Sequence, residues 1–158
     1  MNTRADHVQA IPLQDIQIES GFWGDRLKIN RTATLPAIYR QMQLTGRFDA
    51  WKLNWKPGQP DQPHYFWDSD AGKWIEAAAY SLTTHPDPEL EHQVDEIVEL
   101  IGQAQQPDGY LNIYFTVVEP HNRWRNLREW HELYCAGHLI EAAVAYYQAT
   151  GKRQLLDV

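Results

Sequence analysis

Two aspartates follow a run of aromatic residues in the segment Tyr65-Phe66-Trp67-Asp68-Ser69-Asp70, at the start of a predicted helix. A carboxylate there accepts hydrogen bonds from free backbone N–H groups and is favoured by the helix dipole. One aspartate meets that need, so a second is free to face a ligand. Carboxyl groups that act as acid and base on a glycosidic bond must lie about 5–9.5 Å apart on either side of it. Residues two apart need not face one cavity, so Asp68 and Asp70 are candidate binding residues and not a catalytic pair.

The segment His131-Glu132-Leu133-Tyr134-Cys135-Ala136-Gly137-His138 narrowly misses the zinc motif H-E-x-x-H, because Cys135 occupies the place of the second histidine. A cysteine thiolate can bind zinc, but no third ligand accompanies this one. We therefore predict no metal ligand here and expect Cys135 and His138 to be packed in the interior. His131, near the helix start and beside Trp130, is the better candidate for contact with a ligand. We expect Gly137 to permit close approach of a neighbouring helix.

Three predicted helices would position these residues, and they are of two kinds. The helices 68–83 and 127–150 are apolar on most faces, which indicates burial on most sides. The helix 88–105 between them is amphipathic, with Asp87 as the predicted N-cap and Pro88 at the first helical position. Its apolar stripe consists of Leu90, Val94, Ile97, Val98 and Ile101. The order is therefore inner helix, outer helix, inner helix.

The flanking segments complete this picture. The alternating pattern from Ile11 to Ile18 predicts a short strand, which has no obvious partner. A helix is expected over 25–44 with an interruption at Pro36, and an ordered aromatic loop over 45–67. Residues 109–115 are compatible with an extended segment, and 152–158 with the first turn of another outer helix. Gly151 is the expected left-handed cap of the preceding helix.

Alternating inner and outer helices predict an all-α fold that forms part of an α/α toroid. The competing architecture is a four-helix bundle, but its helices should all be similarly amphipathic. Two inner helices cannot close a ring, so we expect residues 11–158 to be an incomplete N-terminal portion of the toroid, preceded by a disordered segment over 1–10. Its inner helices should expose apolar faces through which the chain self-associates.

Composition excludes several kinds of partner. The formal net charge of −7 argues against nucleic acid, which requires clustered Lys and Arg. No basic amphipathic segment indicates a membrane surface, and no apolar run approaches the ~20 residues of a membrane span. Residues 1–10 lack the apolar core of a signal peptide, and a single cysteine excludes an internal disulfide. These features predict a cytoplasmic protein.

Three motifs in the chain resemble the N-terminal part of the bacterial β-L-arabinofuranosidases of glycoside hydrolase family 127. They are FWDSDAGKWIEAAAYSL (66–82), HPDPELEHQVDEIVELIGQAQQPDGYLN (85–112) and HELYCAGHLIEAAVAYYQATGK (131–152). The resemblance extends from about Val8 to the end of the chain. It implies an (α/α)6-barrel catalytic domain followed by β-sandwich domains, and it would place the orphan strand at 12–18 with a β-sandwich.

The resemblance also implies a chemistry, the removal of terminal L-arabinofuranose from plant-derived oligosaccharides. The nucleophile implied is a zinc-bound cysteine thiolate, the acid/base is a glutamate, and the zinc is held by one glutamate and three cysteines. None of these can be placed on this sequence, and Cys135 matches none of them. His131 falls on the motif histidine that hydrogen-bonds the sugar. Asp68 and Asp70 match a family motif without an assigned role.

We therefore expect a truncated carbohydrate-binding portion of a glycosidase, inactive alone, without a cofactor of its own although the full-length enzyme would hold zinc. Two alternatives remain open at this stage. One is another α/α-toroid sugar enzyme, of the unsaturated uronyl hydrolase or epimerase type. The other is a non-catalytic gene remnant that works only through a partner chain.

Overall fold

The computed structural model describes residues 10–158, so the disordered N-terminus predicted over 1–10 lies outside the described residues except for Ala10. Within them the chain is helical and contains no strand, which confirms the all-α prediction. The α-helices are α1 (Gly21–Ile29), α2 (Leu35–Leu44), α3 (Trp67–Thr84), α4 (Pro88–Ala104), α5 (Tyr114–Val117) and α6 (Glu132–Thr150). Three 3-10 helices, η1 (Leu13–Asp15), η3 (Asp49–Lys52) and η4 (Pro120–Asn122), and one π-helix, η2 (Asn30–Thr34), join them.

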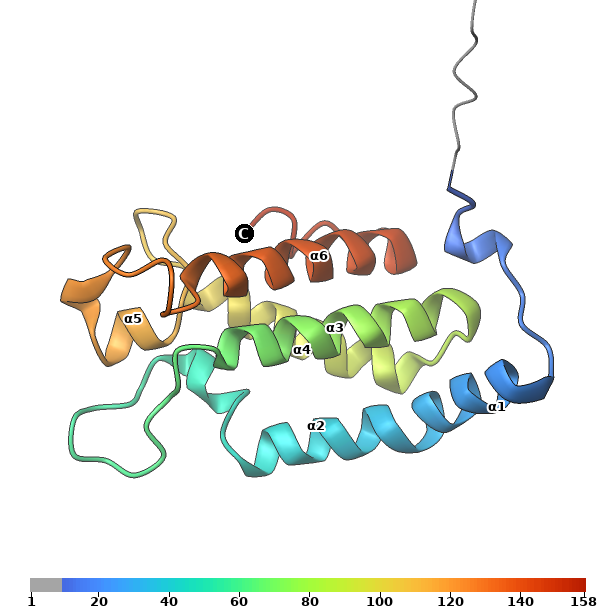
Figure 1. Cartoon of the computed structure of the whole chain (residues 1–158), viewed down its shortest axis with the longest axis horizontal. Coiled ribbons are helices and arrows are strands. Elements are labelled where there is room, and N and C mark those ends of the chain that lie inside the picture. The colour runs from blue at the N-terminus through green and yellow to red at the C-terminus, as the bar shows by residue number, and fades with distance from the viewer. Residues whose placement is uncertain (1–9) are drawn as a thin grey trace, which may run out of the picture.

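The helices α3 and α6 run side by side in the same direction, and α2 and α4 run antiparallel to them (Figure 1). Both α3 and α6 therefore begin at the same end of the molecule. The irregular segments 53–66 and 105–131 gather at this end (Figure 1). This arrangement is the one that part of an α/α toroid requires, with parallel inner helices and antiparallel outer ones.

The core lies around α3, because this helix contributes buried residues on several faces. Apolar side chains of α4 and α6 pack against it, together with Trp51 of η3. The buried stripe of α4 is the one that its periodicity predicts, Leu90, Val94, Ile97, Val98 and Ile101. The predicted N-cap is also confirmed, since the Asp87 side chain accepts hydrogen bonds from the backbone N–H groups of Glu89 (3.1 Å) and Leu90 (3.2 Å).

The close approach of α3 and α6 occurs at Gly72, and among residues 10–158 no helix makes the close approach expected at Gly137. A Cβ atom placed on Gly72 would lie 3.0 Å from the backbone oxygen of His138 and 3.1 Å from its carbonyl carbon. A Cβ atom on Gly137 would meet no atom within 4 Å. The reason is orientation, since Gly137 lies on a side of α6 that faces away from α3.

The strand predicted near the N-terminus is absent. Residues Leu13–Asp15 form η1 instead, closed by hydrogen bonds from Asp15 N to Pro12 O (3.0 Å) and from Ile16 N to Leu13 O (3.1 Å). A strand needs a neighbour to satisfy its backbone groups, and none of residues 10–158 supplies one. A local turn satisfies part of the backbone without a partner.

Pro36 is accommodated by a π-helical turn. Proline has no N–H and its ring clashes with the carbonyl of an α-helix one turn earlier. The chain widens over η2, where Leu35 N donates to Asn30 O, and Pro36 stands in the first turn of α2. The predicted interruption of the helix over 25–44 is thus confirmed, while its start at Gly21 precedes the predicted one.

Two other boundaries differ from the predictions, and the turn expected over 152–158 is present. The helix expected from Leu127 begins at Glu132, although its cap at Gly151 is confirmed with φ 74°. The segment 109–115 is not extended throughout, because α5 begins at Tyr114. Residues 152–158 form one turn closed by hydrogen bonds to Arg153 O from Leu156 N (2.8 Å) and Asp157 N (3.0 Å).

The glycine pair provides a test of the α3–α6 packing. Gly72→Ala should lower the free energy of unfolding by about 1–3 kcal/mol, because the new methyl group overlaps the backbone of α6, which cannot rotate away. Gly137→Ala is the matched control and should be neutral or stabilising by up to about 1 kcal/mol, since alanine favours the helix. Urea unfolding followed by circular dichroism measures both. Equal effects of the two substitutions would contradict the packing described.

Candidate functional site

The buried polar and charged side chains of residues 10–158 all lie at the end where α3 and α6 begin. They are Asp68, Ser69, Asn112 and Glu132. A buried polar group costs free energy unless it is hydrogen-bonded, so such a concentration requires a compensating network. The network connects the starts of the two inner helices to the loops between them.

Asp68 has no exposed surface (0%) and holds a loop of the chain. Its Oδ2 accepts a hydrogen bond of 3.0 Å from Ile113 N, whereas Oδ1 has no partner within residues 10–158. Burial raises the pKa of this carboxyl from its ordinary value of 3.8 to about 7, against the lowering effect of the backbone hydrogen bonds. The predicted capping role is not observed, since α3 begins without a side-chain cap.

Glu132, which the sequence reasoning did not single out, is the second buried carboxylate. It accepts hydrogen bonds from the hydroxyl of Tyr110 and, through both oxygens, from Trp124 N at 2.9 and 3.1 Å. Burial and then the hydrogen bond to Glu132 raise the pKa of Tyr110. Glu132 therefore joins the start of α6 to the two preceding loops, and its place after His131 in the motif was the only available signal.

His131 is half-buried at the N-cap of α6 and has a left-handed backbone conformation (φ 58°, ψ 17°). Such a conformation costs a β-substituted residue roughly 1 kcal/mol or more and is often found at functional sites. Its Nδ1 lies 2.7 Å from Glu129 O. A carbonyl only accepts, so Nδ1 carries the proton and the neutral ring presents Nε2 as an acceptor.

Aromatic rings surround the His131 imidazole. The ring centroids of Tyr65, Phe66 and Tyr134 lie 5.5, 6.1 and 5.4 Å from that of His131. Tyr65 and Phe66 come from the loop before α3, whereas Tyr134 is in the first turn of α6. We call Tyr65, Phe66, Tyr134 and His131 together the aromatic site.

Asp70 lies on another side of α3. Its Oδ2 forms an ion pair of 2.8 Å with Arg47 Nε, and the guanidinium of Arg47 lies 5.0 Å from the ring centroid of Trp67. Asp70 also lines a hollow shared with Ile38 and Met42 of α2. The structure thus brings Asp68, Asp70 and His131 to the same end of the helices but not to a single cavity.

Cys135 is buried, and its thiol donates a weak hydrogen bond to Tyr65 O at 3.5 Å. Burial and the neighbouring Asp68 charge raise the pKa of the thiol to about 12. A thiol with this pKa stays protonated at neutral pH, and a protonated thiol is neither a good nucleophile nor a metal ligand. The expectation of an interior Cys135 is confirmed.

These features define the class of protein. Parallel inner helices and antiparallel outer helices, with an aromatic site at the inner-helix starts, describe a segment of an α/α toroid. The part of the chain that the structure describes contains no helix with the length and apolar character to cross a membrane.

Comparison with known proteins specifies the class further. Residues 15–158 match the family model for the β-L-arabinofuranosidase GH127 catalytic domain. A non-reducing end β-L-arabinofuranosidase of Bifidobacterium longum subsp. longum is 48% identical over 97 residues, which are 59% of this chain and 15% of that protein.

Solved structures agree. A GH127 β-L-arabinofuranosidase from Geobacillus stearothermophilus T6 superposes with a TM-score of 0.80 at 45% identity, over 89% of this chain and 24% of that one. A second GH127 β-arabinofuranosidase gives a TM-score of 0.84 at 38% identity, over 93% of this chain and 25% of that one. The chain belongs to the GH127 β-L-arabinofuranosidase family, and it spans about a quarter of the length of these solved relatives.

The buried carboxyl of Asp68 predicts a specific pH dependence. Between its ordinary pKa and about 7, the folded chain keeps a proton that the unfolded chain releases, so this group makes stability fall as pH rises through that window. Asp68→Asn keeps an acceptor for Ile113 N and removes the titration. Relative to the wild type, the free energy of unfolding of the variant should therefore rise by a few kcal/mol between about pH 4 and pH 8.

Urea unfolding at a series of pH values measures this difference. The control is Asp157→Asn, which removes an exposed carboxylate from an ion pair with Arg153. A plot of its free energy of unfolding against pH should run parallel to that of the wild type. If the free energies of Asp68→Asn and the wild type also run parallel over the whole range, the carboxyl does not titrate as described.

Proposed function

We propose that this chain supplies part of the sugar-binding site of a glycoside hydrolase that acts on terminal β-L-arabinofuranosides of plant-derived oligosaccharides. The observation that carries the proposal is the aromatic site, where a half-buried histidine presents a free ring nitrogen among three aromatic rings at the starts of both inner helices. The names of the matched relatives support the choice of sugar and linkage.

His131 is the proposed sugar contact. In its neutral form Nε2 accepts a hydrogen bond from a sugar hydroxyl, while the bond from Nδ1 to Glu129 O fixes the orientation of the ring. The rings of Tyr65 and Tyr134 offer apolar faces against which a furanose ring packs. The left-handed backbone at His131 is explained in this proposal as strain retained for the position of the imidazole.

Asp68 and Asp70 serve the same site indirectly in this proposal. Asp68 is fully buried, so its proposed role is to hold the loop at Ile113 against the start of α3. Asp70 holds Arg47 against Trp67 and thereby orders the segment that enters the aromatic loop. Their proposed contribution is the shape of the site.

The catalytic centre lies elsewhere in this proposal. The zinc that the resemblance implies needs three cysteine ligands, and this chain has one cysteine, whose thiol is buried with a pKa raised to about 12. These residues do not fit that zinc, and no catalytic step is assigned to them. We expect the 158-residue chain to bind the sugar and not to hydrolyse it.

Self-association of the isolated chain is a further part of the proposal. α6 exposes Leu133, Ile140 and Val144, which lie seven and four residues apart and so form one stripe. In a toroid an inner helix contacts an inner neighbour on each side, and α3 occupies only one side of α6. The exposed stripe is the expected surface for a second copy in solution.

The proposal predicts binding without turnover. Methyl β-L-arabinofuranoside should show saturation transfer from the chain in NMR, while p-nitrophenyl β-L-arabinofuranoside releases no nitrophenolate. His131→Asn removes the imidazole but tolerates the left-handed backbone, and it should abolish the transfer. His121→Asn, at an exposed histidine of η4, is the matched control and should leave the transfer unchanged.

Two results would contradict the proposal. Nitrophenolate release by the purified chain would show that it carries a catalytic centre. Unchanged saturation transfer in His131→Asn would show that the sugar does not contact this residue.

A further inference from the structure

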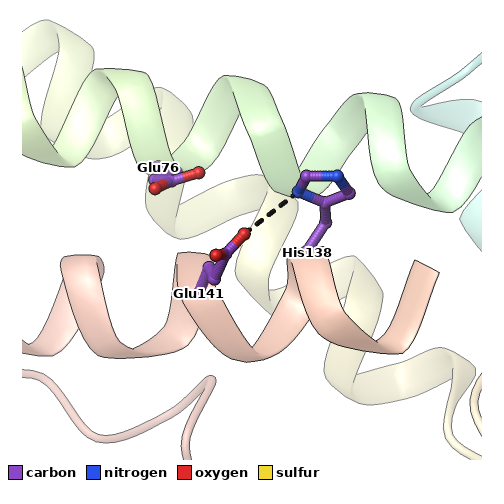
Figure 2. A group of neighbouring side chains, drawn as sticks. All are labelled: Glu76, His138 and Glu141. Carbon is purple, nitrogen blue, oxygen red and sulfur yellow. Dashed lines mark ion pairs between the residues drawn. The ribbon is translucent and has the colours of Figure 1, made fainter. Parts of the chain in front are cut away.

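Three potential metal ligands lie together where α3 and α6 face each other, beside the aromatic site, since the ring centroid of His138 is 4.5 Å from that of Tyr134. Glu76 projects from α3, and His138 and Glu141 project from α6 toward the same region (Figure 2). One carboxylate oxygen from each glutamate and one imidazole nitrogen all lie within 4.8 Å of one another. The close approach of the helices at Gly72 and His138 brings the three side chains into reach.

The negative charge of the two glutamates is not neutralised by any lysine or arginine of residues 10–158, and His138 is the one basic side chain that pairs with Glu141 there. None of the lysines or arginines there forms an ion pair with Glu76 or Glu141. Lys73, one turn before Glu76, is engaged elsewhere, with Nζ 3.3 Å from Ser69 Oγ and 4.8 Å from the ring centroid of Tyr134. The two carboxylates therefore leave room for a cation.

The imidazole of His138 supplies a second, independent observation. Its Nδ1 is buried and pairs with Glu141 Oε2 at 3.2 Å (dashed line in Figure 2), and it forms no hydrogen bond of acceptable geometry within the described residues. Two lone-pair atoms at this separation repel unless a proton or a cation lies between them. A proton on Nδ1 makes this the ion pair drawn in Figure 2, and a cation to one side of the pair would contact both atoms in place of that proton.

The separations suit a small divalent transition-metal ion. Zinc binds histidine nitrogen and carboxylate oxygen at about 2.0–2.2 Å, so neighbouring ligands of a tetrahedral ion lie about 3.3 Å apart. The distance of 3.2 Å from His138 to Glu141 meets this value. Glu76 would complete a set of three ligands, because its oxygen lies within 4.8 Å of both other ligand atoms.

We propose that Glu76, His138 and Glu141 bind a divalent transition-metal ion of the zinc type, with a fourth position open to water. His138 and Glu141 also line a surface hollow, which gives the ion a path of entry. This site is distinct from the cysteine-rich zinc centre that the resemblance implies, since it contains no cysteine. It contradicts the expectation that the chain holds no metal ligand. Spacing along α6 alone could not show it, because Glu76 comes from another helix.

The ion would join α3 to α6 and so stabilise the packing of the inner helices. Metal that binds only the folded chain raises its melting temperature, by an amount that grows with the logarithm of the ratio of free metal to Kd. Zinc chloride titrated into the chelator-treated 158-residue chain should bind with one ion per chain by calorimetry and raise the melting temperature. Cobalt in place of zinc should give the visible absorption of a tetrahedral site.

Substitutions identify the ligands. Loss of even an outer partner of a metal site weakens binding about 10–100-fold, so His138→Asn and Glu76→Gln should each weaken it at least tenfold. The control pair is His92→Asn and Glu96→Gln, which alters an exposed histidine–glutamate pair on α4 with Nε2–Oε1 3.5 Å and no third ligand. These controls should bind zinc as the wild type does, and circular dichroism should show that every variant keeps its helices.

Three results would overturn the proposal. The first is the absence of saturable zinc binding by the wild-type chain. The second is zinc binding that survives His138→Asn and Glu76→Gln in folded protein. The third is an equal loss in the His92→Asn and Glu96→Gln controls, which would indicate general surface binding. A Cys135→Ser variant should leave affinity unchanged, and loss of binding there would assign the ion to the thiol.

Discussion

The packing of α3 against α6 at Gly72 is the constraint on which the rest of the structure depends. The absence of a side chain at position 72 lets the backbone of His138 lie close to α3, and the two helices run side by side and in parallel. Parallel helices begin at the same end, so the aromatic site forms from both. The same approach brings Glu76 to His138 and Glu141 in the middle of the groove.

Buried carboxyl groups at the helix starts carry a cost that their hydrogen bonds to the loops partly offset. Asp68 holds Ile113, and Glu132 holds Tyr110 and Trp124, so both groups fix the first part of the connection between α4 and α6 and Glu132 also fixes its later part. His131 directly precedes Glu132 and inherits its position from this network. Burial raises the pKa of Asp68 by more than its backbone hydrogen bonds lower it.

The sequence predicted the elements well where burial follows from periodicity. The apolar stripe of α4, its cap at Asp87 and the largely apolar α3 and α6 all required only local spacing. Predictions failed where the outcome depends on a contact distant in sequence. Glu132 ends the loop by binding Trp124, so α6 starts later than helix propensity suggests, and the strand near Ile16 lacks a partner.

The site was predictable in part for the same reason. Motif position pointed to His131 and to the end of the helices where Asp68 and Asp70 lie. It could not show that Asp68 is buried and accepts a hydrogen bond from Ile113 N, or that Asp70 forms an ion pair with Arg47 on the side of α2. It also could not show that Glu76 faces α6. Which face of a nearly all-apolar helix meets which neighbour is decided by packing, and a single sequence leaves that choice open.

A crystal structure of the chain with methyl β-L-arabinofuranoside tests the central claim most directly. The account predicts the furanose between the rings of Tyr65 and Tyr134, with a hydroxyl within hydrogen-bond distance of His131 Nε2. Ligand bound instead in the hollow between α2 and α4, which is lined by Tyr39 and Phe48, would contradict it. So would a His131 ring turned away from a sugar at the aromatic site.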